Sequence, residues 1–363
     1  MPASPLTTGE RRLRRALVAT AVFAAAMVVV VGAVVAYWFR AVLPTEPDPF
    51  TRGPYLTRVG TTDATLRWSV DGDRRVEIVA TTPEGREIRS ATGRLTGLTP
   101  GATQGWMAVV DGSARASGTI TTAPTDRRAP IHFVAFGDYG AGDEDEWAVG
   151  RVASAQRPAF TLVPGDNSYL AAAPSLFDRN IFRPMRTLLA QGPFVATLGE
   201  HDLAWFGGSD VATALGLPDG GKRYVWNFGP VRVLVLGLEA DAADVPFVRR
   251  ELAKPGARRT YVVVHRPPKP GNPVLQAARG RVAAVFAGHN HRYERRTVDG
   301  VLTLTVGTGG APRSGDERLT PVSGDAQVSL AVFGLMRVDD RADGADMVFL
   351  DSSGRVRDRV HVR

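Results

Sequence analysis

The chain has 363 residues, of which 44% are hydrophobic, so it is long enough to bury a sizeable core and to form two domains. Its formal net charge is +7, but only Lys222, Lys254 and Lys269 are lysines among 44 basic residues. No stretch interleaves clustered arginines with aromatic residues, so the charge does not indicate a nucleic-acid surface. The absence of cysteine excludes disulfides and thiolate metal ligands, and leaves the redox compartment open.

An apolar run near the N-terminus predicts a membrane anchor. Residues 16–39 are 24 residues without a charge, enough to cross the roughly 30 Å hydrocarbon core of a bilayer. Four arginines, Arg11, Arg12, Arg14 and Arg15, precede the run and only Arg40 follows closely, while Tyr37 and Trp38 lie where interfacial aromatic residues are expected. We therefore expect a single-pass cell-membrane protein with a cytoplasmic tail (1–15), a transmembrane helix (16–39) and an extracytoplasmic remainder. A cleaved signal peptide is the alternative, although the run is long for one.

A proline-rich spacer and a small β domain are expected next. The segment 40–52 contains Pro44, Pro47 and Pro49 and is typical of an extended linker. Alternating segments then recur between Gly, Asp and Pro turns, at 64–68, 75–79 and 106–110, which predicts a β-sandwich over 53–124 with Trp68 in its core. The turn Leu98-Thr99-Pro100-Gly101 resembles one of fibronectin type III domains. A second linker is expected over 121–130.

Five polar motifs follow five apolar runs in the remaining chain. Each motif begins where a buried strand is expected to end, which is where α/β sheets place active sites. The motifs are Gly137-Asp138, Gly165-Asp166-Asn167-Ser168-Tyr169, Gly199-Glu200-His201-Asp202, Val262-Val263-Val264-His265 and Gly288-His289-Asn290-His291. Their carboxylates and imidazoles are about as many as a pair of divalent or trivalent ions requires, including one bridging carboxylate.

Each motif has an ordinary structural interpretation when it is taken alone. A single Asp after Gly is usually a turn former or helix cap, and Tyr169 is also compatible with simple packing. Yet four of the six histidines lie inside the motifs, leaving His132 and His361 as expected sheet residues. This clustering favours a metal site. The acidic run Asp143–Glu146 is expected to be a solvated loop rather than a further metal site.

Taken in order, these motifs resemble those of the calcineurin-like metallophosphoesterases, and Tyr169 resembles the tyrosine of the purple acid phosphatase branch. The resemblance covers roughly residues 130–312 and implies a catalytic domain over 130–363. It implies a first, Fe(III)-like metal held by Asp138, Tyr169 and His291, and a second metal held by His265 and His289. Asp166 would bridge the two ions.

One position departs from the family pattern. The remaining ligand of the second metal is an Asn in the family, and Glu200 stands there in this chain. A carboxylate still ligates through one oxygen, but it adds negative charge beside a site for phosphate. The resemblance makes His201 the phosphate-contacting residue and a candidate acid for the leaving group. Arg266 or Lys269 is a candidate substitute, by charge, for histidines that several relatives carry after the Val-x-x-His motif.

The sequence therefore predicts an α/β (α+β) protein with a two-sheet β core flanked by helices, the four-layer metallophosphoesterase fold. The resemblance implies a dinuclear cofactor, Fe(III) plus Fe, Mn or Zn, that supplies hydroxide to attack phosphorus, with Asp166 and His201 as catalytic residues. The expected substrate is a phosphorylated small molecule or a surface phosphoester, with no nucleic-acid partner. A phosphomonoesterase is favoured. A phosphodiesterase and a catalytically weak surface binding protein that retains the fold are the alternatives.

Overall fold

The computed structural model describes residues 48–169, 172–204, 207–312 and 326–363. The predicted cytoplasmic tail (1–15), the transmembrane helix (16–39) and most of the linker (40–52) lie outside the described residues. In the part of the chain that is described, no helix is both long and apolar enough to cross a membrane.

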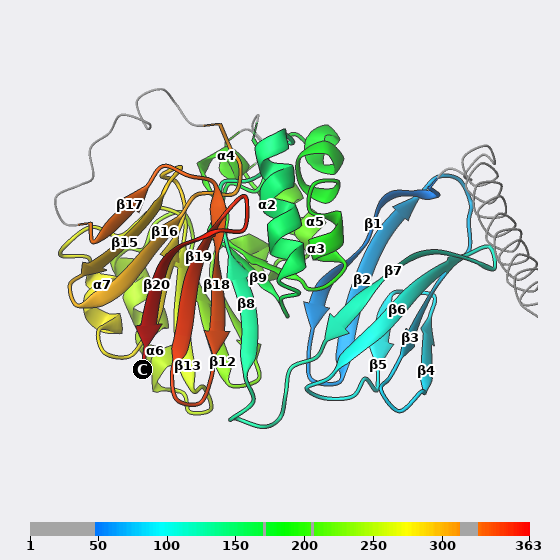
Figure 1. Ribbon diagram of the computed structural model, residues 1–363, viewed down its shortest axis with the longest axis horizontal. Helices are drawn as coiled ribbons and strands as arrows, with labels where there is room; N and C mark the ends of the chain where they lie inside the picture. Colours follow the sequence, from blue (N-terminus) through cyan, green and yellow to red (C-terminus); the bar gives the residue numbers. More distant parts are fainter. Residues whose placement is uncertain (1–47, 170–171, 205–206, 313–325) are drawn as a thin grey trace, which may run out of the picture. The chain divides into compact units, whose positions relative to one another are not determined.

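The first seven strands form two antiparallel sheets (Figure 1). One sheet has the order β1-β2-β5 and the other the order β4-β3-β6-β7. The alternation in these segments buries every second residue, as in β6, because one face of each sheet packs on the other. The fibronectin type III-like identification stays a prediction. The strands are β1 (Phe50–Val59), β2 (Asp63–Val70), β3 (Val76–Thr81), β4 (Glu87–Ser90), β5 (Arg94–Thr96), β6 (Thr103–Val110) and β7 (Ser113–Thr121).

Trp106, not Trp68, is the buried tryptophan of these sheets. Trp106 is 3% exposed, and its indole N–H donates to the carbonyl of Ala190 at 3.0 Å. Trp68 is partly buried and packs against the core cluster, so it contributes to the core without filling it as expected. A buried indole needs an acceptor for its N–H, and the carbonyl of Ala190 supplies one from the part of the chain that follows the sheets.

Two further sheets follow. The six-stranded sheet has the order β10-β9-β8-β18-β19-β20, and the seven-stranded sheet has the order β11-β12-β13-β14-β16-β15-β17. Strands β8 to β10 are parallel to one another, as are β12, β13, β14 and β16. The strands are β8 (Ile131–Ala135), β9 (Thr161–Val163), β10 (Phe194–Ala196), β11 (Tyr224–Phe228), β12 (Val231–Val235), β13 (Arg259–Val264), β14 (Ala284–Ala287), β15 (Tyr293–Val298), β16 (Val301–Val306), β17 (Val328–Leu330), β18 (Gly334–Asp340), β19 (Ala345–Asp351) and β20 (Val356–Val362).

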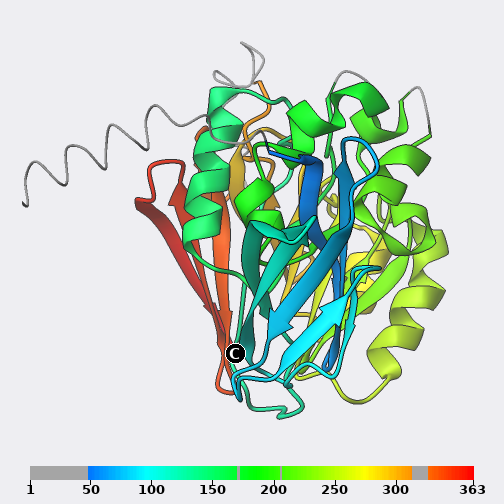
Figure 2. The same ribbon diagram turned by 90° about the vertical axis from the view of Figure 1, so that its right-hand side faces the viewer.

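The side-chain alternation within these strands divides the core into layers. Phe133 of β8 and Val263 of β13 share one cluster between the two sheets. Val134, the next residue after Phe133, instead packs with helices on the outer face of its sheet, and Val264 does the same on the other side. In Figure 2 helices lie on both sides of the strands. The two-sheet core flanked by helices is therefore present, and the fold is a mixed α/β arrangement consistent with the expected class.

The helices that cover these sheets are short. Helices α2 and α3 pack against the six-stranded sheet, and α6 and α7 against the seven-stranded sheet. The α-helices are α2 (Glu144–Ala155), α3 (Arg186–Leu189), α4 (Glu200–Leu203), α5 (Ser209–Leu215), α6 (Val245–Ala253) and α7 (Pro273–Ala278). Short 3-10 helices span Pro174–Leu176, Pro218–Gly221 and Ala242–Asp244, and one π-helical turn spans Asp178–Phe182.

The acidic run after the first motif starts a helix and is not a solvated loop. Asp143 caps α2, and its carboxylate accepts from the backbone N–H of Glu146 at 3.0 Å. The acidic residues of the first turn face the positive end of the helix dipole, which stabilises them there. Glu146 is buried, and burial raises the pKa of its carboxyl well above the ordinary value.

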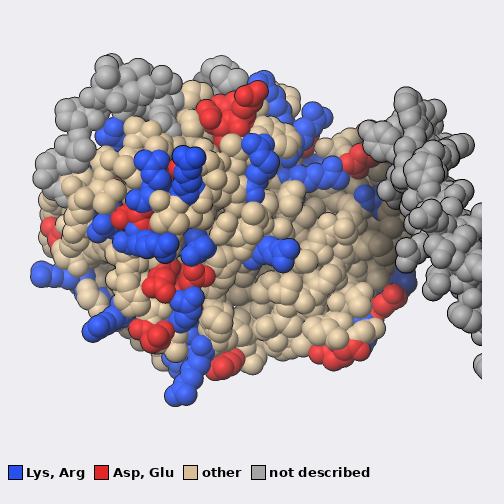
Figure 3. Space-filling view, viewed as in Figure 1, with Lys and Arg blue, Asp and Glu red and all other residues tan. Residues whose placement is uncertain are grey.

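The outer surface over β15 and β18 to β20 carries both signs of charge (Figure 3). Arginines on these strands or directly after them pair with nearby carboxylates: Arg295 with Asp358 at 2.8 Å, Arg337 with Asp339 at 3.2 Å and Arg341 with Asp346 at 2.6 Å. The two histidines outside the motifs lie here as expected, His132 on β8 beside Asp339 and His361 on β20 beside Asp346. Neighbouring charges therefore largely offset one another on this face.

Candidate metal centre

The strand ends bring the five motifs to one edge of the two sheets. Asp138 follows β8, and Asp166 and Tyr169 follow β9. Glu200 and His201 begin α4 directly after β10. From the other sheet, His265 follows β13, and His289 and His291 follow β14. Parallel strands end at the same edge, which explains how residues more than a hundred positions apart meet.

Three of the ligand positions have a backbone conformation that is uncommon for residues other than glycine. Asp138, Asp166 and His289 have φ values of 56°, 50° and 69°, in the left-handed region. Such a conformation costs a non-glycine residue about 1 kcal/mol or more. The neighbouring glycines allow close approach: a Cβ at Gly199 would collide with the carboxylate of Asp166, and one at Gly288 with that of Asp138. The motif glycines therefore make room for the two carboxylates.

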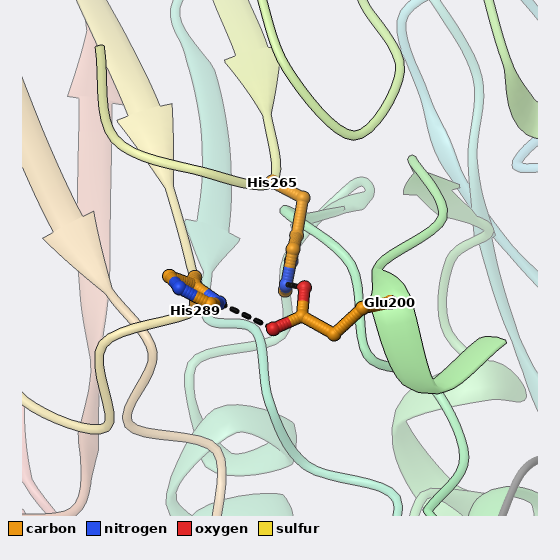
Figure 4. Close-up of side chains that lie close together, drawn as sticks. All are labelled: Glu200, His265 and His289. Atoms are coloured by element: carbon orange, nitrogen blue, oxygen red, sulfur yellow. Dashed lines mark ion pairs between the residues drawn. The ribbon is translucent and has the colours of Figure 1, made fainter. Parts of the chain in front are cut away.

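Glu200, His265 and His289 form the first group of candidate ligands. The Glu200 carboxylate lies between the two imidazoles (Figure 4), with Oε1 2.5 Å from His289 Nδ1 and Oε2 2.7 Å from His265 Nε2. Despite these distances the atoms are not aligned as hydrogen bonds, so Glu200 Oε2, His265 Nε2 and His289 Nδ1 are buried without a hydrogen-bond partner. Three converging, unpartnered ligand atoms are what a cation site provides.

A second group surrounds Asp138 and Asp166. With His265, these two carboxylates place ligand atoms within 4.8 Å of one another. The hydroxyl of Tyr169 donates to Asp166 Oδ2 at 3.3 Å and lies 2.8 Å from His291 Nε2. His291 Nε2 is 3.5 Å from Asp138 Oδ1. All seven residues predicted as ligands therefore lie together, while the role of each one stays a prediction.

The electrostatics of the site also fit cations. Burial and the nearby carboxylate of Asp138 raise the pKa of Asp166 to about 8. Burial, together with Asp138 and Asp166, raises the pKa of Tyr169 well above its ordinary value. Burial lowers the pKa of His265, but the contact with Glu200 and the charge of Asp138 outweigh it and raise the pKa to about 10. A positive charge among these groups would keep the carboxylates ionised and the imidazole neutral. The residues present thus fit a metal pair.

Hydrogen bonds orient the imidazoles toward the centre. His265 Nδ1 donates to the carbonyl of Pro164 at 2.7 Å, which leaves Nε2 as the ligand atom. His291 Nδ1 donates to the carbonyl of Pro312 at 2.8 Å and likewise leaves Nε2 facing the site. The backbone N–H of His289 donates to both oxygens of Asp138, at 2.9 and 3.0 Å, which fixes that carboxylate.

Asp202 is a supporting residue to which the sequence interpretation gave no role. Its fully buried carboxylate accepts from the backbone N–H of Gly199, Asn167 and Ser168, at 2.9 to 3.1 Å, and from the side chain of Asn167 at 2.9 Å. It therefore ties the loop that carries Asp166 to the loop that carries Glu200. Burial raises the pKa of Asp202, while these bonds act in the opposite direction. Its place in the motif beside His201 was a signal that could have identified it.

The two residues predicted to contact substrate both neighbour Glu200, His201 in the chain and Arg266 in space. His201 is exposed, its backbone N–H donates to Asp166 Oδ1 at 3.0 Å, and its ring lies 4.4 Å from that of Tyr169. Arg266 Nη1 donates to Glu239 Oε1 at 2.6 Å, and Arg266 Nε is 3.8 Å from Glu200 Oε2. Arg266 therefore offsets part of the negative charge that Glu200 adds.

Comparison with known proteins agrees with this geometry. Residues 131–293 match the model of the family of calcineurin-like phosphoesterases. The fold is similar to that of purple acid phosphatase PPD1 from seeds of yellow lupin (Lupinus luteus), with a TM-score of 0.68 and 15% identity over 85% of this chain and 74% of the lupin chain. It is also similar to the solved structure of PhoD, with a TM-score of 0.63 and 11% identity over 87% of this chain and 93% of that one. No curated protein matches the chain significantly in sequence.

At 11% and 15% identity, the structural similarity shows the fold alone. The match to the family model adds evidence from the sequence, over one segment of the chain. That segment begins with β8 and ends at Tyr293, so it contains all five motifs. Residues 131–293 thus carry a calcineurin-like metallophosphoesterase domain, and this match together with the fold supports a metal-dependent phosphoesterase.

Proposed function

We propose that the protein is a membrane-anchored, extracytoplasmic hydrolase of phosphoric esters with a dinuclear metal centre, and that phosphomonoesters are its substrates. The observation that carries the proposal is the convergence of carboxylates, imidazoles and one phenol at the shared edge of two sheets, with unpartnered ligand atoms on Glu200, His265 and His289. Small phosphorylated molecules or surface phosphoesters are the proposed substrates, with no nucleic-acid partner.

Two groups of residues would hold the ions. Asp138, Tyr169 and His291 would hold an Fe(III) ion, and Glu200, His265 and His289 an Fe, Mn or Zn ion, with Asp166 shared between them. When bound, the ions would activate water and neutralise phosphate oxygens. His201, whose backbone N–H donates to Asp166, is the proposed proton donor to the departing alkoxide. Arg266 provides positive charge next to Glu200, where a phosphate oxygen would otherwise meet a carboxylate.

Metal analysis of the purified region 49–363, combined with a substrate screen, tests the proposal. We expect two metal ions per chain, visible absorption from a Tyr169–Fe(III) contact, and faster hydrolysis of a phosphomonoester than of a phosphodiester. A preference for the diester would make the protein a phosphodiesterase. Metal-free protein that hydrolyses neither ester would favour a binding protein.

The proposed anchor has its own test. A reporter that is active only outside the cytoplasm, fused after Phe50, is expected to be active, and the protein is expected to stay with membranes after a salt wash, because 24 apolar residues insert essentially irreversibly. Release of a soluble form that begins near Ala36 would instead indicate a cleaved signal peptide.

Replacing Glu200 by Asn is expected to keep both metals bound, to shift the metal preference of the second position, and to leave hydrolysis equal or faster. The substitution removes an anionic oxygen that favours Mn, Fe or Mg and that repels phosphate. Metal content after reconstitution with competing ions, and kcat/KM, measure both effects. Glu200→Gln is the matched control, because it removes the charge and keeps the side-chain length. Loss of hydrolysis with both metals retained would make Glu200 a catalytic group in its own right.

A further inference from the structure

A cavity of about 660 Å³ is lined by residues next to the segments that carry the candidate metal ligands, and by none of the ligands themselves. Leu198 and Leu203, on either side of the segment with Glu200 and His201, form part of its wall, together with Gly237 and Leu238 after β12. Cavities of this size and partly apolar lining typically bind small organic molecules. None of the five motifs requires it, so its function is separate from holding the metals.

Backbone hydrogen bonds join the cavity wall to the metal-binding loop. The N–H of His265 donates to the carbonyl of Gly237 at 3.3 Å, and the N–H of Arg266 donates to the carbonyl of Leu238 at 2.8 Å. The side chain of Arg266 then links Glu239, at the cavity wall, to Glu200, at the metal centre. A group attached to a phosphate that is bound at the metal centre would therefore lie next to this cavity.

Most charges around the cavity are compensated within the protein. Arg223 Nη2 pairs with the buried Asp244 at 2.8 Å, and Glu239 pairs with Arg266 at 2.6 Å. The Asp241 carboxylate accepts from the N–H of Ala243 at 2.7 Å. Among the residues that the structure describes, Lys222 has no ion pair, so its ammonium is available to an acceptor group. In the described part of the chain, the wall therefore combines an apolar part with a cation, Lys222, and a carboxylate, Asp241, neither of which has an ion pair.

We propose that this cavity is the leaving-group pocket of the enzyme, and that its substrates are phosphomonoesters of compact, partly apolar alcohols of about nucleoside size. This inference rests on the proposed function and specifies its substrate class. In the reaction, water provides the oxygen that bonds to phosphorus, the ester P–O bond breaks, and the alcohol leaves with a proton from His201. The apolar wall contacts the body of the alcohol, and Lys222 meets an acceptor atom on it.

Gly237 allows the pocket to be filled without disturbing the fold. A Cβ built at Gly237 has Lys222 O, at 3.5 Å, as its nearest neighbour, which is an ordinary contact, and its φ is not in the left-handed region. Gly237→Leu is therefore expected to fold and to occupy the pocket. Gly105→Leu is the matched control, because Gly105 is exposed on β6, away from the motifs, and a Cβ there meets nothing within 4 Å.

The probes are adenosine 5′-monophosphate and methyl phosphate, which both release a primary alkoxide and differ in the size of the leaving group. We expect the wild-type chain to have a higher kcat/KM for the nucleotide. Gly237→Leu is expected to lower that kcat/KM about tenfold or more, as lost pocket contacts typically do. Hydrolysis of methyl phosphate and inhibition by inorganic phosphate are expected to stay unchanged, and Gly105→Leu is expected to match the wild type on both substrates.

Two results would overturn the inference in distinguishable ways. If the wild type hydrolyses both esters equally well, or if Gly237→Leu affects both equally, the cavity is not the leaving-group pocket although the enzyme is a phosphomonoesterase. If the wild type with metals bound hydrolyses neither ester, the proposed function fails together with the substrate class.

Discussion

Replacing Asp166 by Asn is expected to reduce bound metal and to lower hydrolysis by about 10³-fold or more, which corresponds to about 4 kcal/mol of transition-state stabilisation. Asp166 is 1% exposed, and its Oδ2 lies 3.6 Å from His265 Nε2 and 3.3 Å from the Tyr169 hydroxyl. Its carboxylate therefore lies near a candidate ligand of each proposed ion. The Asn carbonyl still accepts from the N–H of His201, so the loop is expected to keep its shape.

Without metal, the Asp166→Asn variant is expected to be at least as stable toward unfolding as the wild type. Burial and Asp138 raise the pKa of Asp166 from 3.8 to about 8, so the folded state binds more protons than the unfolded state between these values. The free energy of unfolding of chelated wild type therefore decreases as the pH rises from about 4 to about 8, and Asp166→Asn removes this contribution.

Metal content, hydrolysis and thermal unfolding with a chelator measure these effects together. The control is Asp73→Asn, in the exposed connection between β2 and β3. It is expected to change neither metal content, nor hydrolysis, nor thermal unfolding. If Asp166→Asn retained two metals and full activity, the bridging role of Asp166 would be wrong.

The arrangement of the ligands was predictable because it depends on local pattern. Asp138, Asp166 and His265 each follow a continuous apolar run, and a run of that kind marks a strand that is buried on both faces. Parallel strands then bring their carboxyl ends together without any further specification by the sequence. The two-sheet core followed from the same runs, since an apolar strand must be covered on both sides.

Other features depended on tertiary partners that periodicity does not specify. The insertion of β18 between β8 and β19 joins residues about two hundred positions apart, and no local pattern indicates that register. Asp202 is charged in sequence but fully buried, because three backbone N–H groups from two loops point at it. Trp68 and Trp106 both lie in alternating segments, and the acceptor for the buried Trp106 indole is Ala190, a residue too distant in sequence for a local pattern to reveal.

Replacing His201 by Gln is expected to lower kcat by about 10²- to 10⁴-fold while both metals stay bound. The imidazole is exposed and does not belong to either group of converging ligand atoms, so its removal leaves the ligand set intact. Its position is fixed by the bond from its backbone N–H to Asp166 and by the Tyr169 ring at 4.4 Å. These contacts keep the ring beside Tyr169 and the loop of Asp166, from which we expect it to reach a departing ester oxygen.

The dependence on the leaving group distinguishes a proton donor from a simple phosphate contact. An alkyl phosphate releases a strongly basic alkoxide that needs a proton, whereas 4-nitrophenyl phosphate releases a stable phenolate. If His201 donates the proton, His201→Gln loses most of its activity on the alkyl ester and much less on the nitrophenyl ester. An equal loss on both esters would show that His201 only binds phosphate, and loss of metal would show that it is a ligand. His132→Gln, on β8 beside Asp339, is the control that removes an imidazole away from the metal centre.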